Sequence, residues 1–477
     1  MSVLTRLDYR LLGLVTVASV LIRVVLLSRA GSLVGIDGAQ YMALAHAIAS
    51  RDLSGYNGMR TPGYPFLLAI LERNVSAIQI TQLIMGVCTA LMTYVIIRLA
   101  TGQASYAFFG GMLCTLTPSI FTYEVNVLTE ATTTFLCTLA CLCLVLCLHP
   151  SHRHRRLWLV SLAAVCGILP LVRPNLLFLP VLVVAGLLVS ALLHSRHRQM
   201  GLVIVCLALS VAPVLAWSTV NLRATGYFGL STALGYNLTN HTGAFIDDAP
   251  SKYHDIRTIY LDERQTHVWS DAFLSRFHLA TNQINVIWEP GVIPAMMRST
   301  GLDFDELSRR LVGMDLGLIA SHPLLYSQQV LAASPYFFLG VGHGGVPNVS
   351  SIWPHGMPLG VRVWWSLARL MTAVLAFGAL FVVPTLVVVR RLRASTAPWI
   401  AWFLAWSWTA LVLASLVQAA IEFGDANRFG VPLAPSSIAV GVTAVAALWQ
   451  ALRRRAQARV VGQAQPGRSA RPGGRSE

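Results

Sequence analysis

Apolar residues occur along this chain in long runs, and polar residues gather between the runs. A helix that crosses a bilayer needs about 20 predominantly apolar residues. Runs of this kind predict about ten membrane-spanning helices, near residues 10–30, 77–99, 105–122, 127–148, 157–172, 175–193, 200–217, 363–389, 398–420 and 431–450. The pattern therefore predicts an all-α polytopic membrane protein.

One long polar interruption divides the predicted spans into two groups. Residues 1–217 form an N-terminal transmembrane module, whose first outer loop covers 31–76, and residues 363–452 form a C-terminal transmembrane module. Between them, residues 218–362 are predicted to be a large extracytoplasmic loop region. The last residues, 453–477, are rich in Gly, Arg and Gln and predict a disordered basic cytoplasmic tail.

The basic residues between the runs predict the orientation, because short cytoplasmic loops retain arginine and lysine. Counting spans from a cytoplasmic N-terminus places every strong basic cluster inside. These clusters are Arg153, Arg155 and Arg156, then Arg196 and Arg198, then Arg390, Arg391 and Arg393, then Arg453, Arg454 and Arg455. Both termini are therefore expected in the cytoplasm of a multi-pass cell-membrane protein, with the remaining polar segments outside.

Composition agrees with a bilayer as the main solvent and excludes several classes of function. The chain has 477 residues, of which 55% are hydrophobic and 12% charged, whereas soluble domains carry about 25% charged residues. The net charge of +15 does not indicate nucleic acid as a partner, because no basic stripe is interleaved with aromatic residues. All eight cysteines lie in apolar runs, which argues against disulfides and a structural zinc site. No phosphate-binding loop or dinucleotide motif is present, so no nucleotide cofactor is expected.

The first outer loop contains a candidate site residue, Asp37. Asp37 precedes Tyr41, Leu44, Ala45 and Ile48, whose helical spacing predicts an amphipathic helix along the outer membrane surface. Asp37 is also placed to cap this helix, with Gln40 as its capping-box partner. The two roles are compatible, since a capping carboxylate keeps a free oxygen for a substrate.

Three arginines at outer ends of spans run against the positive-inside rule. Arg60 lies beside Pro62 and Gly63, Arg173 precedes Pro174, and Arg428 precedes Pro432. Each arginine either snorkels to the interface or binds phosphate with its planar fork of donors. We predict that Arg60 and Arg428 converge on one phosphate, although they are far apart in the chain.

Two acidic residues stand at the outer start of the fourth predicted span. Glu130 either complements the positive end of the helix or has a functional role, because an acid at the edge of an apolar span is costly. Glu124 precedes it in the short turn. Both glutamates are candidate catalytic residues.

The ordered set of these residues resembles a family, the bacterial membrane glycosyltransferases of the protein-mannosyltransferase and aminoarabinose-transferase type, which have the GT-C fold. The matching pieces are Asp37 with Tyr41, Arg60 with Pro62-Gly63-Tyr64-Pro65, Pro118 with Leu128-Thr129-Glu130, Arg173-Pro174, the segment 226–238, and Arg428 with Pro432 and Pro435. The resemblance implies a sugar donor carried on a polyprenyl phosphate and an acceptor glycosylated outside the cytoplasm.

This chemistry assigns a role to each candidate. Asp37 would be the base, Arg60, Arg428 and Arg173 would bind the lipid phosphate, and Glu130 or Glu124 would orient the acceptor or hold a divalent metal ion. Attack opposite the phosphate would invert the anomeric carbon. Whether a metal takes part is left open by the sequence.

The acceptor and two other functions also stay open. Protein mannosyltransferases have an Asp-Glu pair in the first outer loop, whereas Asp37 is followed by Gly38 here, and this departure argues against a protein acceptor. The acceptor stays open among a glycan, a lipid and a protein. A lipid or glycan transporter also has many spans and charges, but its polar residues tend to lie near the membrane midplane rather than at one interface. An envelope glycan polymerase or ligase would use the same lipid phosphates.

Overall fold

The computed structural model describes residues 4–29, 34–194, 200–266, 286–339, 358–389, 396–422 and 426–463, and within these ranges it contains helices and no strand. Eight helices are long and apolar enough to cross a membrane. They are α1 (Arg6–Arg29), α4 (Val75–Thr101), α7 (Glu130–Leu148), α8 (Arg155–Val172), α10 (Met200–Thr225), α18 (Leu359–Val388), α20 (Pro398–Ile421) and α22 (Ala434–Gln463). The predicted all-α polytopic membrane fold is confirmed. The predicted count of about ten spans is approximate, because eight described helices are long and apolar enough by themselves.

The two remaining predicted spans depart from a simple helix. The run at 105–122 is broken into α5 (Ala104–Leu116) and α6 (Pro118–Phe121), with a 52° bend between the two arms. Thr117 is extended at the break, as expected for a residue before proline. The run at 175–193 is the shorter helix α9 (Phe178–His194).

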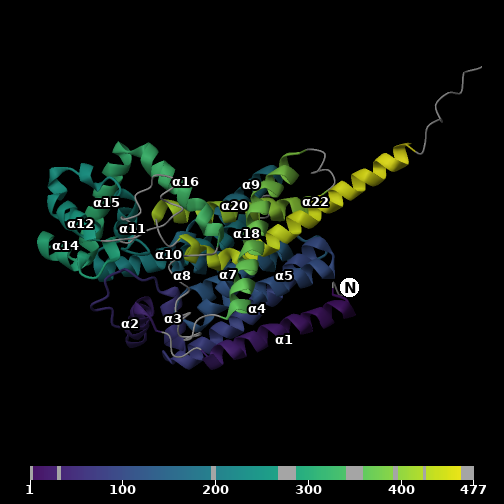
Figure 1. Cartoon of the computed structure of the whole chain (residues 1–477), viewed down its shortest axis with the longest axis horizontal. Coiled ribbons are helices and arrows are strands. Elements are labelled where there is room, and N and C mark those ends of the chain that lie inside the picture. Colours follow the sequence, from purple (N-terminus) through teal and green to yellow (C-terminus); the bar gives the residue numbers. More distant parts are fainter. Residues whose placement is uncertain are drawn as a thin grey trace, which may run out of the picture.

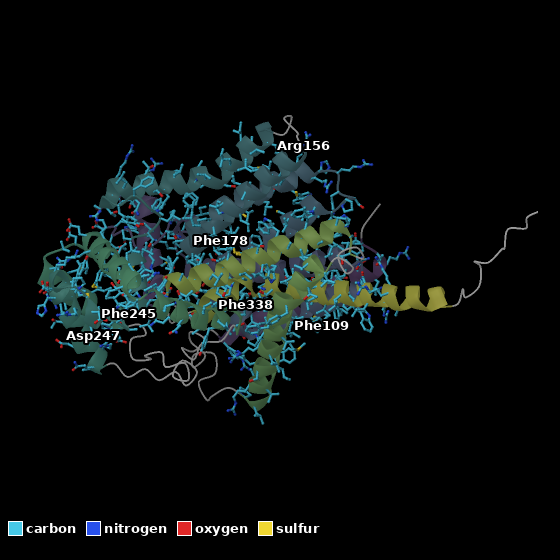
Figure 2. The ribbon with its side chains drawn as sticks, turned by 90° about the horizontal axis from the view of Figure 1, so that it is seen from above. Phe109, Arg156, Phe178, Phe245, Asp247 and Phe338 are labelled. Atoms are coloured by element: carbon cyan, nitrogen blue, oxygen red, sulfur yellow. The ribbon has the colours of Figure 1, made fainter. Side chains whose placement is uncertain are left out.

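The ends of the chain lie on one side of the molecule. The start of α1 and the end of α22 are at one end of the long axis, and α11 (Leu234–Thr242), α12 (His254–Thr266), α14 (Val292–Thr300) and α15 (Phe304–Ser321) are at the other (Figure 1). Arg156 lies away from Phe245 and Asp247 of the polar end (Figure 2). The predicted even number of crossings and the cytoplasmic position of both termini stay predictions, since eight described helices, or nine with a bent pair, are long and apolar enough to span a membrane.

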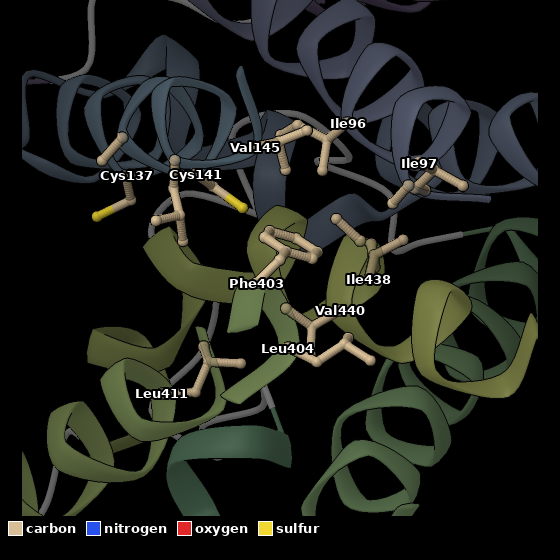
Figure 3. Packing of buried hydrophobic residues seen from close by; sticks show 14 of the residues in the cluster. Ile96, Ile97, Cys137, Cys141, Val145, Phe403, Leu404, Leu411, Ile438 and Val440 are labelled. Carbon is tan, nitrogen blue, oxygen red and sulfur yellow. The ribbon is translucent and has the colours of Figure 1, made fainter. Parts of the chain in front are cut away.

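The membrane helices share one large apolar core. Phe403 of α20 is fully buried, with Cys137, Cys141 and Val145 of α7 on one side and Ile438 of α22 close by (Figure 3). The eight cysteines are all free. Six of them are buried in the core, where they act as small apolar side chains, and Cys88 and Cys147 are partly buried.

The predicted extracytoplasmic loop region folds as helices around a core of its own. Tyr236, Ile256, Tyr260 and Leu311 are fully buried in it. Helix α16 (Pro323–Leu339) of the same region joins the membrane bundle instead, because the Tyr326 hydroxyl donates to a backbone carbonyl of α20 at 2.7 Å and Ser334 bonds Ser415 at 2.6 Å.

A short helix and the C-terminal end of α22 complete the described fold. The apolar run 62–71 forms α3 (Gly63–Ile70), which is too short to cross a membrane, as predicted. The predicted disordered tail is wrong for its first part, since α22 continues to Gln463 through strong helix formers such as alanine and arginine. Residues 464–477 of that tail lie outside the described residues.

Candidate active site

Five charged side chains from five separate segments meet at the polar end of the bundle. Asp37 is in α2 (Ile36–Ser50), Arg60 precedes α3, Glu130 begins α7, Arg173 follows α8, and Arg428 is in α21 (Ala426–Gly430). The ion pairs alternate in sign from Arg60 through Asp37, Arg428 and Glu130 to Arg173. We call this set the charge cluster.

Asp37 accepts hydrogen bonds from two of the three arginines that were predicted to bind phosphate. Arg60 Nη2 donates to its Oδ1 at 2.5 Å, and Arg428 Nη2 donates to its Oδ2 at 3.0 Å. Arg60 is held from the other side by Gln40, whose Oε1 accepts from Nε at 2.8 Å, and its guanidinium lies 4.8 Å from the ring centre of Tyr41. The structure therefore brings Arg60 and Arg428 together, as the sequence predicts.

Glu130 joins the other two arginines. Its Oε1 accepts from Arg428 Nε at 2.6 Å and from Arg173 Nη2 at 2.7 Å. Arg173 also donates from Nε to the Thr129 hydroxyl and stacks 4.7 Å from the ring centre of Phe429, a contact that the sequence did not indicate. Glu130 Oε2 and Arg173 Nη1 are buried and have no hydrogen-bond partner among the described residues. An orphaned acceptor and donor inside a site are positions where a ligand is expected.

The capping role predicted for Asp37 is wrong. The residue before α2 is Gly35, which has no side-chain cap bond, and Asp37 lies inside the first turn. Its two oxygens accept from the arginines instead of from the backbone of the helix. Asp37 lies in the first turn of α2 rather than before it, and its carboxylate forms ion pairs with guanidinium groups of two other segments.

Glu124 lies outside the charge cluster. It is paired with Arg23 of α1, whose Nε and Nη2 donate to both carboxylate oxygens at 2.7 and 2.6 Å. A Cβ atom at Gly86 of α4 would stand 2.1 Å from this carboxylate, so only glycine leaves room for the pair. The structure brings Glu130, but not Glu124, to the cluster with Asp37.

Side chains of α3 and α4 hold the segment that carries Glu124 and Glu130 in place by hydrogen bonds. Gln82 donates from Nε2 to the carbonyls of Glu124 and Asn126, and its Oε1 accepts from the Tyr64 hydroxyl at 2.8 Å. These bonds satisfy irregular backbone inside the bundle, where water is absent. Tyr64 belongs to the motif after Arg60, so one motif supports both halves of the site.

Side chains of the segment 226–238 hold the loop before Arg60 in place by hydrogen bonds. The Ser231 hydroxyl donates to Met59 O at 2.7 Å, and the Thr232 hydroxyl donates to Asn57 O at 2.9 Å. Gly58 has φ of +78°, and a Cβ there would be 2.5 Å from Thr232. The sequence pattern gave this segment no role, whereas the structure shows that it positions the Arg60 loop.

Gly38 explains why an Asp-Glu pair is absent. A Cβ atom at Gly38 would stand 2.9 Å from the Val127 carbonyl oxygen and 3.2 Å from Val34. A larger residue at this position would push α2 away from the segment that leads to Glu130. The second carboxylate of the site is therefore Glu130, contributed by a distant part of the chain.

The cluster is graded in exposure and carries an excess of positive charge. The side chain of Asp37 is 31% exposed, whereas that of Glu130 is 0% exposed. Burial alone raises the pKa of Asp37, but Arg60 and Arg428 outweigh it and hold the pKa below its ordinary value. Three arginines and two carboxylates, all of them ion-paired within the cluster, give it a net charge of +1. Within the described ranges, no three His, Cys, Asp or Glu side chains come close enough to hold a metal ion.

The family comparison agrees with the motifs. The model of a family described as dolichyl-phosphate-mannose-protein mannosyltransferase matches residues 64–217, about a third of the chain. The predicted resemblance to membrane glycosyltransferases of this type is thereby confirmed over the segment that carries Glu130 and Arg173. No protein with a curated description matches the sequence.

Two solved structures are similar to this chain. One is the oligosaccharyltransferase AglB from Archaeoglobus fulgidus, in complex with an inhibitory peptide and a dolichol-phosphate, with 15% identity and a TM-score of 0.43. The match covers 97% of this chain and 52% of that one, so this chain spans about half its length. The other is ArnT from Cupriavidus metallidurans bound to undecaprenyl phosphate, with 15% identity, a TM-score of 0.36, and coverage of 86% and 77%.

Proposed function

We propose that this protein is a membrane glycosyltransferase that moves a sugar from a polyprenyl-phosphate donor to a hydroxyl of an extracytoplasmic acceptor. The observation that carries the proposal is the charge cluster, in which three arginines and two carboxylates from five segments converge with an excess of one positive charge. A sugar linked through a phosphodiester to a lipid has one negative charge, which matches this excess.

The arginines fit the departing phosphate. As the bond from the anomeric carbon to phosphate oxygen breaks, the leaving phosphate gains negative charge, and fixed cations lower the barrier where that charge develops. Arg173 Nη1, buried and without a protein partner among the described residues, is an available donor for it. Arg60 and Arg428 are the other two donors, and their planar forks suit phosphate oxygens.

Asp37 fits the role of base. The acceptor oxygen attacks the anomeric carbon, its proton passes to the Asp37 carboxylate, and the polyprenyl phosphate leaves with the bonding electron pair. Asp37 is the more exposed of the two carboxylates in the cluster, so an acceptor in water reaches it first. Attack from the face opposite the phosphate inverts the anomeric configuration.

Donor binding activates this base. Without a ligand, the two arginines lower the pKa of Asp37 and make it a weak base. A lipid phosphate that draws the guanidinium groups of Arg60 and Arg428 to its own oxygens removes that effect, and the basicity of Asp37 then rises. The carboxylates thus keep the arginines in place until the donor arrives.

For the acceptor, we propose only the group that reacts, which is a hydroxyl. A hydroxyl on a glycan, a lipid or a protein suits a carboxylate base equally well. No side chain fits at position 38 of α2, so this position does not contribute a second carboxylate next to Asp37. The second acid of the site is Glu130, and we propose that it orients the acceptor or the sugar from the buried side.

The test is transfer by the purified full-length protein from a panel of labelled donors. The panel contains hexoses and pentoses on polyprenyl phosphate, the same sugars on polyprenyl pyrophosphate, and the same sugars on nucleotides. Transfer from polyprenyl-phosphate sugars alone is expected, with a product of inverted anomeric configuration. Transfer of preassembled glycans from the pyrophosphate would favour a polymerase or ligase instead. Movement of lipid across vesicles without transfer would favour a flippase and contradict the proposal.

A further inference from the structure

A cavity lies in the bundle beside the charge cluster, where four helices meet the break between α5 and α6. Its lining combines an arginine, several hydroxyls and two aromatic rings: Thr117, Ser119, Phe337, Phe338, Arg369, Thr372, Ala376, Gly430, Ala434 and Ser437. Phe338 lies between Phe245 at the polar end and Phe109 in the bundle (Figure 2). Irregular backbone inside a membrane protein is tolerated where it lines a cavity, and the bend at Thr117 does so here.

Arg369 is the unusual member of this lining. It lies within the candidate span α18, yet among the described residues it has neither an ion pair nor a hydrogen bond. Other arginines of the bundle are paired, Arg23 with Glu124, Arg98 with Asp8 and Arg173 with Glu130. An unpaired cation in a membrane-spanning segment is costly and is kept where it has a function.

The surroundings of Arg369 suit an anion attached to an apolar chain. Ser119 and Ser437 place hydroxyl donors in the same wall, and Phe337 and Phe338 provide an apolar surface. A guanidinium binds phosphate oxygens through its planar fork, and hydroxyls add further donors. Among the described residues that line the cavity there is no carboxylate, so an anion suits this lining better than a cation.

A second arginine marks a route to the cavity. Arg362 is exposed and stands seven residues before Arg369, two turns along α18 on the same face. The N-terminal end of α18 is held to the break in the neighbouring span, because Trp364 Nε1 donates to Leu116 O at 2.9 Å. A lipid phosphate at the membrane surface would meet Arg362 first and Arg369 next.

The cavity and the charge cluster share a wall. Gly430 lines the cavity and is the last residue of α21, the helix that carries Arg428. A Cβ at Gly430 would stand 1.7 Å from the Phe337 carbonyl oxygen, so α21 packs directly on α16 between the two sites. Thr117 and Ser119 begin the segment that ends at Glu130.

We propose that this cavity is a second lipid-phosphate site, where Arg369 binds the phosphate of a polyprenyl phosphate outside the charge cluster. A donor waiting for the cluster, or a spent carrier leaving it, would occupy this site. The anion site stands on the geometry of Arg369. The identity of the lipid as the polyprenyl carrier rests on the proposed function.

The experiment counts bound lipids on the full chain. Wild-type protein in phosphatidylcholine nanodiscs receives undecaprenyl phosphate, and native mass spectrometry measures the number of molecules bound per chain. Two are expected for the wild type and one for Arg369→Gln. Arg298→Gln is the matched control, since it removes an exposed arginine of α14, and it should still bind two. Arg173→Gln should lose the lipid of the charge cluster and keep the one at Arg369.

Further measurements separate folding from binding and one lipid from another. Without added lipid, Arg369→Gln should unfold at a temperature no lower than the wild type, because no described protein group loses a partner. Arg369→Lys keeps the charge without the planar fork, so its affinity should fall about tenfold while the second lipid still binds.

Three results would overturn the proposal. The first is two bound molecules of undecaprenyl phosphate in Arg369→Gln, and the second is one bound molecule in both the wild type and that variant. The third comes from a parallel titration with phosphatidylglycerol: if Arg369→Gln loses a bound phosphatidylglycerol but no undecaprenyl phosphate, the cavity is a phospholipid site. If the protein transfers no sugar but still binds two lipid molecules per chain, the proposed function is wrong and the Arg369 site stands.

Discussion

Asp37 is the residue on which the proposed chemistry depends most directly. Asp37→Asn keeps the size of the side chain but removes the charge and the basicity, so turnover should fall by about 10²–10⁴ if Asp37 accepts the proton. Turnover of polyprenyl-phosphate sugar by folded protein is the measurement. Because Asp37 pairs with arginines rather than capping α2, the helix itself should persist, and circular dichroism checks this. Normal turnover in the variant would remove Asp37 from the mechanism.

The ion pair with Arg60 predicts a change in pH dependence. Arg60 lowers the pKa of Asp37, so Arg60→Gln should raise that pKa. A base with a raised pKa is protonated at higher pH, and activity is then lost earlier as the pH falls. The acid limb of kcat/KM, which reports the free enzyme, should therefore lie at higher pH in Arg60→Gln than in the wild type. An acid limb at the same pH in both proteins would show that Asp37 does not set it.

At the scale of the element, the packing of α2 against the segment before Glu130 sets the position of the Asp37 carboxylate. Gly38→Ala would place a Cβ 2.9 Å from Val127 O and force α2 outward. A displacement near 1 Å of a catalytic group can cost about 10² in rate, so turnover should fall by roughly that factor. Gly35→Ala is the control, because no heavy atom lies within 4 Å of its Cβ position. Equal turnover in the two variants would contradict the positioning role of Gly38.

The pair of Arg23 and Glu124 predicts a loss of stability rather than of catalysis. Removing one partner of a buried ion pair costs about 3–5 kcal/mol, whereas apolar replacement of both is often neutral. Arg23→Met should therefore lower the unfolding temperature, and Arg23→Met with Glu124→Met should recover much of the loss. Turnover per folded molecule should stay near the wild-type value in the double variant. A large loss of turnover in stable protein would return Glu124 to the catalytic residues.

At the scale of the whole molecule, the positions of the termini predict the side on which the cluster works. In a background without the eight native cysteines, single cysteines at Ser54 and Ser251 should react with an impermeant thiol reagent in intact cells. A cysteine at Ser151 should not react. All three positions are exposed, so access depends only on the side of the membrane. Labelling at Ser151 with protection at Ser251 would place Asp37 in the cytoplasm and contradict the proposed site.

Much of the fold could be predicted because the bilayer imposes a strong local rule. Each span must satisfy its own backbone hydrogen bonds and present apolar side chains, so helices such as α4 and α7 are visible as runs in the sequence. The sequence also indicated Asp37, Arg60, Glu130, Arg173 and Arg428, because charges at the outer ends of apolar spans are costly and therefore conspicuous.

Only the tertiary structure decided which of these charges meet. Arg428 reaches Asp37 across 391 positions of sequence and Glu130 across 298, while Glu124 turns to Arg23 across 101. Nothing local separates Glu124 from Glu130, since both are acids in one short segment. The choice between them depends on how α1, α4 and α21 pack, and on glycines at which a side chain would not fit. Periodicity and charge thus determined the helices and the candidates, and long-range packing determined the pairs.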